Sequence, residues 1–318
     1  LKTGWEAQNL KFRFAPDKRL MPADRYLARL MMDTMLMPLE KPQESAIVSI
    51  FTPCELLQEA GIHPYNVEGF SCYLSASKAE RAFLQQAENT GISETLCSYH
   101  KTFIGAAQKK VLPKPKCIVY TNLTCDANLL TFKKLAKMYE VPIFAIDVPM
   151  QQNEDNVQYV ADQLRKLKGF LEDVTGRQIS EEAVAKSVAN SKKAAENYRQ
   201  QLLLRKEHDP VTSLTNELYA IFMCHLLSGS AAPVRYTEML MDDVKKSPKG
   251  DGLHVLWMHI MPFLQEPVKE VFNYSQKMHI SACDFVADGF QMMHAEDPYE
   301  ALAGKMVNCI YNGSVKQR

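Results

Sequence analysis

The sequence predicts an α/β fold with two parallel-sheet lobes, the second incomplete, joined by a helical region. Short runs rich in β-branched residues alternate with helix-like segments in 45–150 and again in 246–318. Such alternation is typical of parallel strands covered by helices. Residues 151–245 lack these runs and carry apolar residues at helical spacing instead. Residues 1–44 are rich in Pro and Met and predict a helical and irregular cap.

The elements of the first lobe follow from short apolar runs, which predict buried strands, and from the polar segments with helical spacing between them. We expect strands at 46–52, 63–69, 117–123 and 142–148, and helices at 54–60, 77–90, 97–109 and 127–139. The strand at 117–123, the helix at 127–139 and the strand at 142–148 form one βαβ unit. The first lobe therefore spans 45–150 and has a parallel sheet.

The helical region and the second lobe follow from the same patterns. We expect helices at 157–171, 180–198 and 212–228, then strands at 254–260 and 280–286 with helices at 264–277 and 298–309. Two strands are too few for a covered parallel sheet. We therefore expect an exposed strand edge, or completion of the sheet by another chain, and a natural chain that continues past residue 318.

The composition excludes several classes of protein. Among the 318 residues, Lys and Arg together number 37, as do Asp and Glu, so the charge gives no reason to expect nucleic acid or an anionic membrane as a partner. No apolar run approaches the roughly 18–20 residues of a membrane span. The eight cysteines include no C-x-x-C pair, which favours reduced thiols and a cytoplasmic protein. Three of them, Cys72, Cys117 and Cys283, sit in strand-like runs and are expected in the core.

The common phosphate-binding and hydrolase motifs are absent. The sequence contains no G-x-G-x-x-G after a strand, no G-x-x-x-x-G-K-[ST], no H-E-x-x-H and no G-x-S-x-G. We therefore do not expect the chain to bind a dinucleotide, or to hydrolyse ATP, with those devices.

Cys97 and Cys125 each open a helix-like segment beside the first sheet. Sites in α/β folds form where strand ends meet helix N-termini, and a helix N-terminus lowers the pKa of a thiol. A thiolate is a good ligand for a soft metal centre such as an iron–sulfur cluster. We therefore expect the two sulfur atoms to face a common cleft. Cys54 also follows a strand and is a third candidate ligand, although all three cysteines have the alternative of being ordinary buried thiols.

Two further residues are candidates for catalysis. Glu55 lies just after the first strand, where its carboxylate either complements the helix dipole or acts as a base or substrate-positioning group. His100 comes three residues after Cys97 on the same helix face. It either hydrogen-bonds a cluster or substrate, or it caps local structure.

Four segments together resemble the 2-hydroxyacyl-CoA dehydratase family, which also includes the benzoyl-CoA reductase subunits. They are Phe51–Leu57, Leu96–His100, Thr124–Asn128 and Asp155–Leu164. Their order along the chain is more specific than any one segment, and the resemblance covers nearly all of 45–318. It implies Rossmann-like lobes and an oxygen-sensitive [4Fe-4S] cluster held by three cysteines.

The resemblance also implies residue roles. Cys97 and Cys125 match two cluster ligands, and Glu55 matches an acidic residue for which a substrate-side role is implied. The third ligand is expected at a strand end in the second lobe and has no match, since Cys309 lies in a helix tail.

The reaction implied by the resemblance is the loss of water from a 2-hydroxyacyl-CoA to give a 2-enoyl-CoA. A separate ATP-hydrolysing activator delivers one electron, and a ketyl radical of the substrate expels the 2-hydroxyl group. The implied partners are this activator, the acyl-CoA and a homologous second subunit or a second copy of the chain. Open alternatives are an aromatic-CoA (benzoyl-CoA type) or double-cubane-cluster reductase subunit, and a non-catalytic partner or electron-relay subunit.

Overall fold

The computed structural model describes residues 2–314 and 316, and it confirms an α/β fold with parallel sheets. The chain forms two compact units, each built from two stretches that are separate in the sequence. Unit 1 consists of Leu1–Leu36 and Glu182–His294, and unit 2 consists of Met37–Glu181 and Ala295–Arg318.

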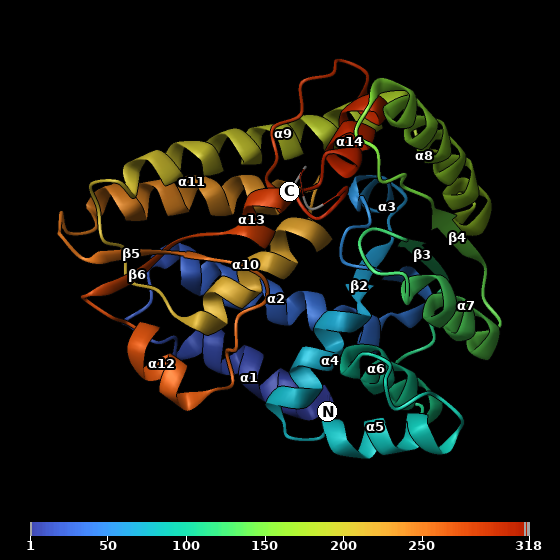
Figure 1. Cartoon of the computed structure of the whole chain (residues 1–318), viewed down its shortest axis with the longest axis horizontal. Helices are drawn as coiled ribbons and strands as arrows, with labels where there is room; N and C mark the ends of the chain where they lie inside the picture. Colours follow the sequence, from blue (N-terminus) through green and yellow to red (C-terminus); the bar gives the residue numbers. More distant parts are fainter. Residues whose placement is uncertain (1, 315, 317–318) are drawn as a thin grey trace. The chain divides into compact units, whose positions relative to one another are not determined.

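A parallel sheet of four strands forms the centre of unit 2 (Figure 1). The strands stand in the order β2-β1-β3-β4, with the bounds β1 Ser45–Val48, β2 His63–Asn66, β3 Cys117–Thr121 and β4 Ile143–Ile146. Strands β1 and β3 are buried over their whole length, as expected of parallel strands that are covered on both faces. Ile47 at the centre of β1 pairs with Tyr65 of β2 and with Ile118 of β3.

Two groups of helices cover this sheet. Helix α8 packs on β4, α3 and α14, whereas α7 packs on β3 and α6, and Figure 1 shows the sheet between the two groups. The helices of unit 2 are η1 Pro42–Glu44, α3 Glu55–Glu59, α4 Val67–Ala76, α5 Glu80–Asn89, α6 Ser98–Gln108, α7 Asn128–Tyr139, α8 Glu154–Thr175 and α14 Pro298–Val307.

Helix α8 illustrates how the sequence sets these elements. Asn153 caps its N-terminus by accepting a hydrogen bond from the backbone of Asn156 at 2.9 Å, and Gly176 ends it with a left-handed backbone (φ 70°). Its buried residues recur at helical spacing: Val160, Ala161, Leu164, Leu167 and Leu171. In the part of the chain that the structure describes, no helix is both long and apolar enough to cross a membrane.

Unit 1 combines a sheet of two parallel strands, β5 Leu253–Trp257 and β6 Met278–Cys283, with several long helices. The helices are α1 Lys2–Phe14, α2 Pro22–Glu40, whose last residues belong to unit 2, α9 Glu181–Leu204, α10 Leu214–Leu226, α11 Ala231–Lys246, α12 Glu266–Phe272 and α13 Asp284–Gly289. Figure 1 shows α9 and α11 side by side, and Asn197 of α9 donates a hydrogen bond to Thr237 of α11 at 3.3 Å.

The exposed edge expected for the second sheet is present in unit 1. Among the described residues β5 pairs with β6 alone. Its side chains stand open to solvent, with Leu253 60% and Leu256 64% exposed. An unpaired strand edge with apolar side chains is a surface on which another strand can add.

Two local predictions are wrong. In the cap expected to be helical and irregular over 1–44, Lys2–Phe14 form a helix on which Trp5 is buried. The strand expected over 63–69 ends at Asn66, because the Asn66 side chain caps α4 by accepting a hydrogen bond from the backbone of Gly69 at 2.6 Å. Cys72 is therefore buried in a helix and not in a strand.

The two units do not coincide with the predicted segments 1–44, 45–150, 151–245 and 246–318. Helix α8 packs on β4 of the first lobe, and α14 packs on α8, so both helices belong to unit 2. Local sequence patterns group neighbouring residues, whereas packing joins segments that are distant along the chain.

The contact between α5 and α6 predicts the effect of a small substitution. A Cβ atom built at Gly105 of α6 would overlap the backbone carbonyl of Phe83 in α5, which cannot move aside alone. We expect Gly105→Ala to lower the free energy of unfolding by about 1–3 kcal/mol, the usual effect of overpacking. Urea denaturation followed by circular dichroism measures this change.

Gly169 of α8 supplies the matched control, because a Cβ there meets no atom within 4 Å. Gly169→Ala should raise the free energy of unfolding by about 0.5–1 kcal/mol through helix propensity. Equal effects of the two substitutions would contradict the close contact at Gly105.

Candidate functional site

Titratable side chains from several segments gather at the carboxyl-terminal edge of the unit 2 sheet. The strand order makes the chain leave β1 and β3 in opposite directions, and ligand sites of open α/β sheets form at such a switch point. The segments that follow the strands carry Cys54 and Glu55 after β1, Glu68 after β2, and Cys125 after β3. Cys97 stands at the start of α6.

Hydroxyl groups join the ends of β1 and β3 at this edge. The Ser49 hydroxyl accepts a hydrogen bond from the backbone of Thr121 at 3.0 Å and lies 3.0 Å from the hydroxyl of Thr52. Thr52 donates in turn to the Val119 carbonyl at 3.4 Å. This buried network fixes the loop that leaves β1 against the end of β3.

Cys125 lies in the turn between β3 and α7, and Asn128 holds this turn from inside. Asn128 is 2% exposed. Its side-chain amide donates to the Thr121 carbonyl at 3.0 Å, and its backbone N–H donates to the Cys125 carbonyl at 3.0 Å. The turn therefore presents a partly exposed thiol from a fixed backbone.

Cys97 is the exposed N-cap residue of α6, as the sequence predicts. The backbone of Lys101 donates to its carbonyl at 3.1 Å, while its side chain makes no capping hydrogen bond. The negative charge of a Cys97 thiolate raises the pKa of Cys125. The two sulfur atoms therefore lie within electrostatic range of each other.

The protonation of Cys125 differs from the expectation. Burial is the largest effect and raises the pKa of its thiol, whereas the backbone N–H groups of Ala127 and Asn128 lower that pKa. The charges of Cys97 and Glu68 raise it further. The N–H groups at the helix start thus lower the pKa of the thiol as predicted, but burial raises this pKa by more. The thiol is protonated at neutral pH, so a metal must displace its proton on binding.

His100 packs against Cys125, although the sequence associates it with Cys97. Its Nδ1 lies 2.9 Å from the Thr131 hydroxyl, and its Nε2 lies 3.7 Å from the Cys125 sulfur. Thr131 donates its own proton to the Ala127 carbonyl at 2.8 Å, so its oxygen accepts from His100 Nδ1–H. Burial lowers the pKa of His100 to about 4. The ring is therefore neutral and directs a lone pair of Nε2 at the Cys125 thiol.

Glu68, near the start of α4, is a site residue that the sequence analysis missed. Burial raises the pKa of its carboxyl to about 7, while a hydrogen bond from the Asn66 side chain at 2.7 Å partly opposes this rise. Its charge acts on both Cys125 and Cys72. Glu68 could have been found by the same rule as Glu55, because both lie just after a strand. The predicted strand at 63–69 instead placed Glu68 inside a strand.

Cys54 and Glu55 lie at the same edge but are buried, each 1% exposed. The Cys54 thiol donates to the Thr52 carbonyl at 3.4 Å, and burial followed by the charge of Glu55 raises its pKa. A buried, protonated thiol favours the alternative in which Cys54 packs inward. The charged groups that act on Cys54 are Glu55 and Lys305, whereas Cys97 and Glu68 act on Cys125. The role of Glu55 toward a substrate stays a prediction.

The fit of an iron–sulfur cluster to these residues is partial. Cys97 and Cys125 are the more exposed cysteines, and the others are buried: Cys54, Cys72, Cys117, Cys224, Cys283 and Cys309. Over residues 2–314 and 316 no group of three His, Cys, Asp or Glu side chains has the arrangement of a metal site. The edge thus offers two thiol ligands, and a third remains unidentified.

The raised pKa of Glu68 predicts a pH dependence of stability. Its carboxyl has a pKa of about 7 in the folded chain against 4.5 when unperturbed, so the folded state binds the proton more tightly. The resulting stabilisation is complete below about pH 4.5 and is lost as the pH rises through about 7. As the pH rises from about 4.5 to about 7, the parent loses this stabilisation and Glu68→Gln does not. The free energy of unfolding of Glu68→Gln should therefore rise by about 2–3 kcal/mol relative to that of the parent over this range. Urea denaturation at several pH values measures the difference.

Glu140 at the end of α7 is exposed and supplies the control. Glu140→Gln makes the same chemical change at an exposed position, and its stability is measured over the same pH range. A stability difference for Glu68→Gln that does not change with pH would contradict the raised pKa.

Comparison with known proteins agrees with the resemblance in the sequence. Residues 49–318 match the family model described as 2-hydroxyglutaryl-CoA dehydratase, D-component. The (R)-phenyllactyl-CoA dehydratase alpha subunit of Clostridium sporogenes is 21% identical over 155 residues, which are 46% of this chain and 38% of that protein. The (R)-2-hydroxyglutaryl-CoA dehydratase subunit alpha of Acidaminococcus fermentans is 25% identical over 92 residues, which are 28% of this chain and 19% of that protein.

The matched segments thus span less than half of each of these relatives. The family model, in contrast, extends over most of this chain and includes the segments that carry Cys54, Cys97 and Cys125. The family expected from the sequence is therefore confirmed: the chain belongs to the 2-hydroxyglutaryl-CoA dehydratase D-component family.

Proposed function

We propose that this chain is a subunit of a 2-hydroxyacyl-CoA dehydratase, which eliminates water from a 2-hydroxyacyl-CoA to give a 2-enoyl-CoA. The observation that carries the proposal is the placement of Cys97 and Cys125 at one sheet edge in a chain of this family. Both relatives are named as dehydratase alpha subunits, which favours dehydration over the reduction of an aromatic-CoA.

In this proposal Cys97 and Cys125 bind two irons of a [4Fe-4S] cluster, and a cysteine not yet identified binds a third. Thiolates are the usual ligands of such clusters. When bound, the cluster would supply a single electron to the substrate thioester. The resulting ketyl radical would expel the 2-hydroxyl group as hydroxide, and loss of a β-proton and return of the electron would then give the 2-enoyl-CoA. The exposure of Cys97 and the partial exposure of Cys125 leave both sulfur atoms accessible.

The residues around Cys125 have to accommodate the loss of its proton. While the thiol is protonated, it donates to the Nε2 lone pair of His100. A thiolate would face that lone pair unfavourably, so the imidazole proton has to move from Nδ1 to Nε2 and the Thr131 hydroxyl has to turn to donate to Nδ1. Glu68, with a pKa of about 7, exchanges protons near neutral pH and acts on the same thiol.

The proposed partners follow from the division of labour in such enzymes. An ATP-hydrolysing activator supplies the electron, which is consistent with a sequence that has no phosphate-binding loop of its own. A homologous second subunit, or a second copy of this chain, completes the enzyme. The proposed location is the cytoplasm, where thiols stay reduced.

The first prediction from this proposal concerns iron. We expect Cys97→Ser and Cys125→Ser each to remove most of the iron and acid-labile sulfide from anaerobically prepared protein, because a hydroxyl is a harder and far less acidic ligand than a thiol. Chemical iron and sulfide analysis, with electron paramagnetic resonance spectroscopy, measures the loss. The fold should remain, since neither side chain belongs to the core.

Cys117 provides the control, because it is buried at the start of β3, away from the carboxyl ends of the strands. Cys117→Ala should retain iron, and Cys54→Ser decides whether Cys54 is a ligand. Full iron content after replacement of both Cys97 and Cys125 would contradict the proposed site. An iron count that corresponds to a double cubane would favour the reductase alternative.

The second prediction concerns turnover. Full-length enzyme with its partner subunit, activator, ATP and reductant should convert a 2-hydroxyacyl-CoA to the 2-enoyl-CoA under anaerobic conditions. The acyl groups named for the relatives, phenyllactyl and 2-hydroxyglutaryl, are the first substrates to test. Omission of ATP should abolish turnover, because the first electron has to be driven onto the thioester. Turnover in air without ATP would rule out the radical mechanism.

A further inference from the structure

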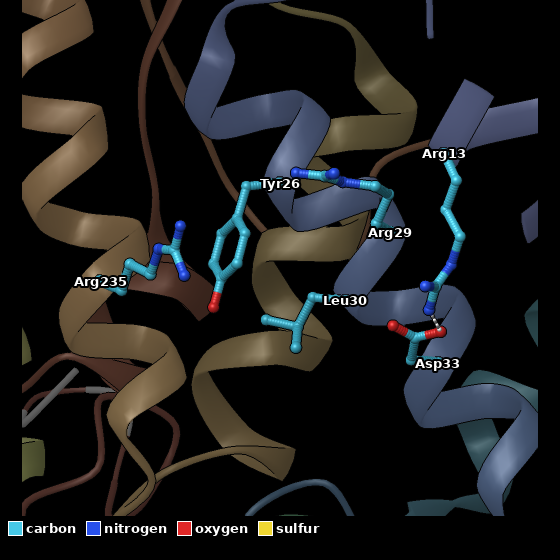
Figure 2. A pocket seen from close by; sticks show the side chains of 6 residues that line it. All are labelled: Arg13, Tyr26, Arg29, Leu30, Asp33 and Arg235. Carbon is cyan, nitrogen blue, oxygen red and sulfur yellow. Dashed lines mark hydrogen bonds and ion pairs between the residues drawn. The ribbon is translucent and has the colours of Figure 1, made fainter. Parts of the chain in front are cut away.

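Unit 1 contains a pocket of about 290 Å³ that has no role in the proposed dehydration (Figure 2). Side chains of α1, α2 and α11 line it: Arg13, Tyr26, Arg29, Leu30, Asp33 and Arg235. Figure 2 shows the three arginines reaching this region from three different helices. Helix α11, which lies far from α1 and α2 in the sequence, thus contributes a third guanidinium group to the same pocket.

The positive charge of the pocket is only partly neutralised. Arg13 pairs with Asp33 at 2.6 Å, and Asp33 also accepts a hydrogen bond from Asn9 at 2.8 Å. Among the described residues, neither Arg29 nor Arg235 has a hydrogen-bonding or ion-pairing partner. Two positive charges therefore remain in a pocket whose single carboxylate already has a partner.

Tyr26 restrains one of the two unpaired arginines, Arg235. The Arg235 guanidinium lies over the Tyr26 ring, 5.0 Å from its centroid, which restrains this flexible side chain by a cation–π contact. The charges of both Arg235 and Arg29 also act on the Tyr26 hydroxyl, and they lower its pKa against the larger, opposite effect of burial. Arg235 and Tyr26 therefore lie in contact in the pocket that Arg29 also lines, and the Tyr26 hydroxyl is itself a hydrogen-bond donor.

This chemistry suits a phosphate group. Guanidinium groups bind phosphate through two parallel hydrogen bonds. A doubly charged phosphate matches the two unpaired guanidinium groups better than a singly charged carboxylate does. Pockets for drug-sized ligands measure about 300–1,000 Å³, so this pocket has room for a phosphorylated fragment but not for an entire acyl-CoA. Arg29 and Arg235 are exposed, which leaves them accessible to a ligand from solvent.

We propose that this pocket binds the phosphate group of a phosphorylated small molecule through Arg29, Arg235 and Tyr26. Two sources carry this chemistry: the phosphates of coenzyme A in an acyl-CoA, and a free nucleotide or inorganic phosphate. The proposal is independent of the dehydration, because binding is measured without iron and without turnover.

Isothermal titration calorimetry in a phosphate-free buffer tests the proposal. The probes are coenzyme A, 3′-dephospho-coenzyme A, ATP and inorganic phosphate, with pantetheine as the probe that lacks phosphate. We expect Arg29→Gln combined with Arg235→Gln to weaken binding of the phosphorylated probes at least about tenfold, because each guanidinium loses a charge-assisted hydrogen bond. Added salt should weaken binding to the parent chain as well.

Arg199 on α9, also exposed and in unit 1, provides the matched control. Arg199→Gln removes the same charge outside the pocket and should leave binding unchanged. Arg29→Lys combined with Arg235→Lys keeps the charge without the planar fork and should give an intermediate loss. Circular dichroism confirms that each variant is folded.

The probes also distinguish the two sources. Tight binding of coenzyme A with weak binding of the dephospho form assigns the pocket to the 3′-phosphate of coenzyme A. Similar binding of ATP, coenzyme A and phosphate assigns it to phosphate in general. Binding that persists in the double Gln variant, or equal binding of pantetheine and coenzyme A, overturns the proposal. So does the absence of binding by every phosphorylated probe.

Discussion

The parallel pairing of β1 with both β2 and β3 is the constraint on which the candidate site depends. Val48, the last residue of β1, pairs with Asn66 on one side and with Val119 on the other, so the three strands have their carboxyl ends at the same edge. The chain then turns away from β1 and β3 in opposite directions, which opens this edge to polar loops. The hydrogen bond from Thr121 to Ser49 links the two ends, and the cysteine turns start from this fixed base.

Burial, more than the helix ends, determines the protonation of the groups at this edge. It raises the pKa of Cys125 and of Glu68 and lowers that of His100, because each charged form loses solvent. The groups around Cys125 are therefore a protonated thiol, a neutral imidazole and a carboxyl with a pKa raised to about 7. Binding of a cationic metal centre would compensate the charge of a Cys125 thiolate that the chain alone disfavours.

The sequence predicts the two parallel sheets and the edge, since strand and helix periods and the strand-end rule depend on local residues, but it misses helices such as α4 and α11. It predicts Cys97 and Cys125 as candidate ligands because both open helical segments. It misses Glu68, because the Asn66 cap that ends β2 was not recognised. It also cannot supply the two units or the arginine pocket, because these depend on packing between segments that are far apart, such as those of Arg29 and Arg235.

The central claim is that Cys97 and Cys125 together hold iron, and anomalous diffraction at the iron absorption edge tests it most directly. Crystals of the anaerobically prepared protein are required, because both thiols oxidise when exposed to air. The account predicts anomalous iron peaks within bonding distance of the sulfur atoms of both Cys97 and Cys125. Iron bound at other cysteines, or no iron beside these two in protein that retains its fold, would contradict it.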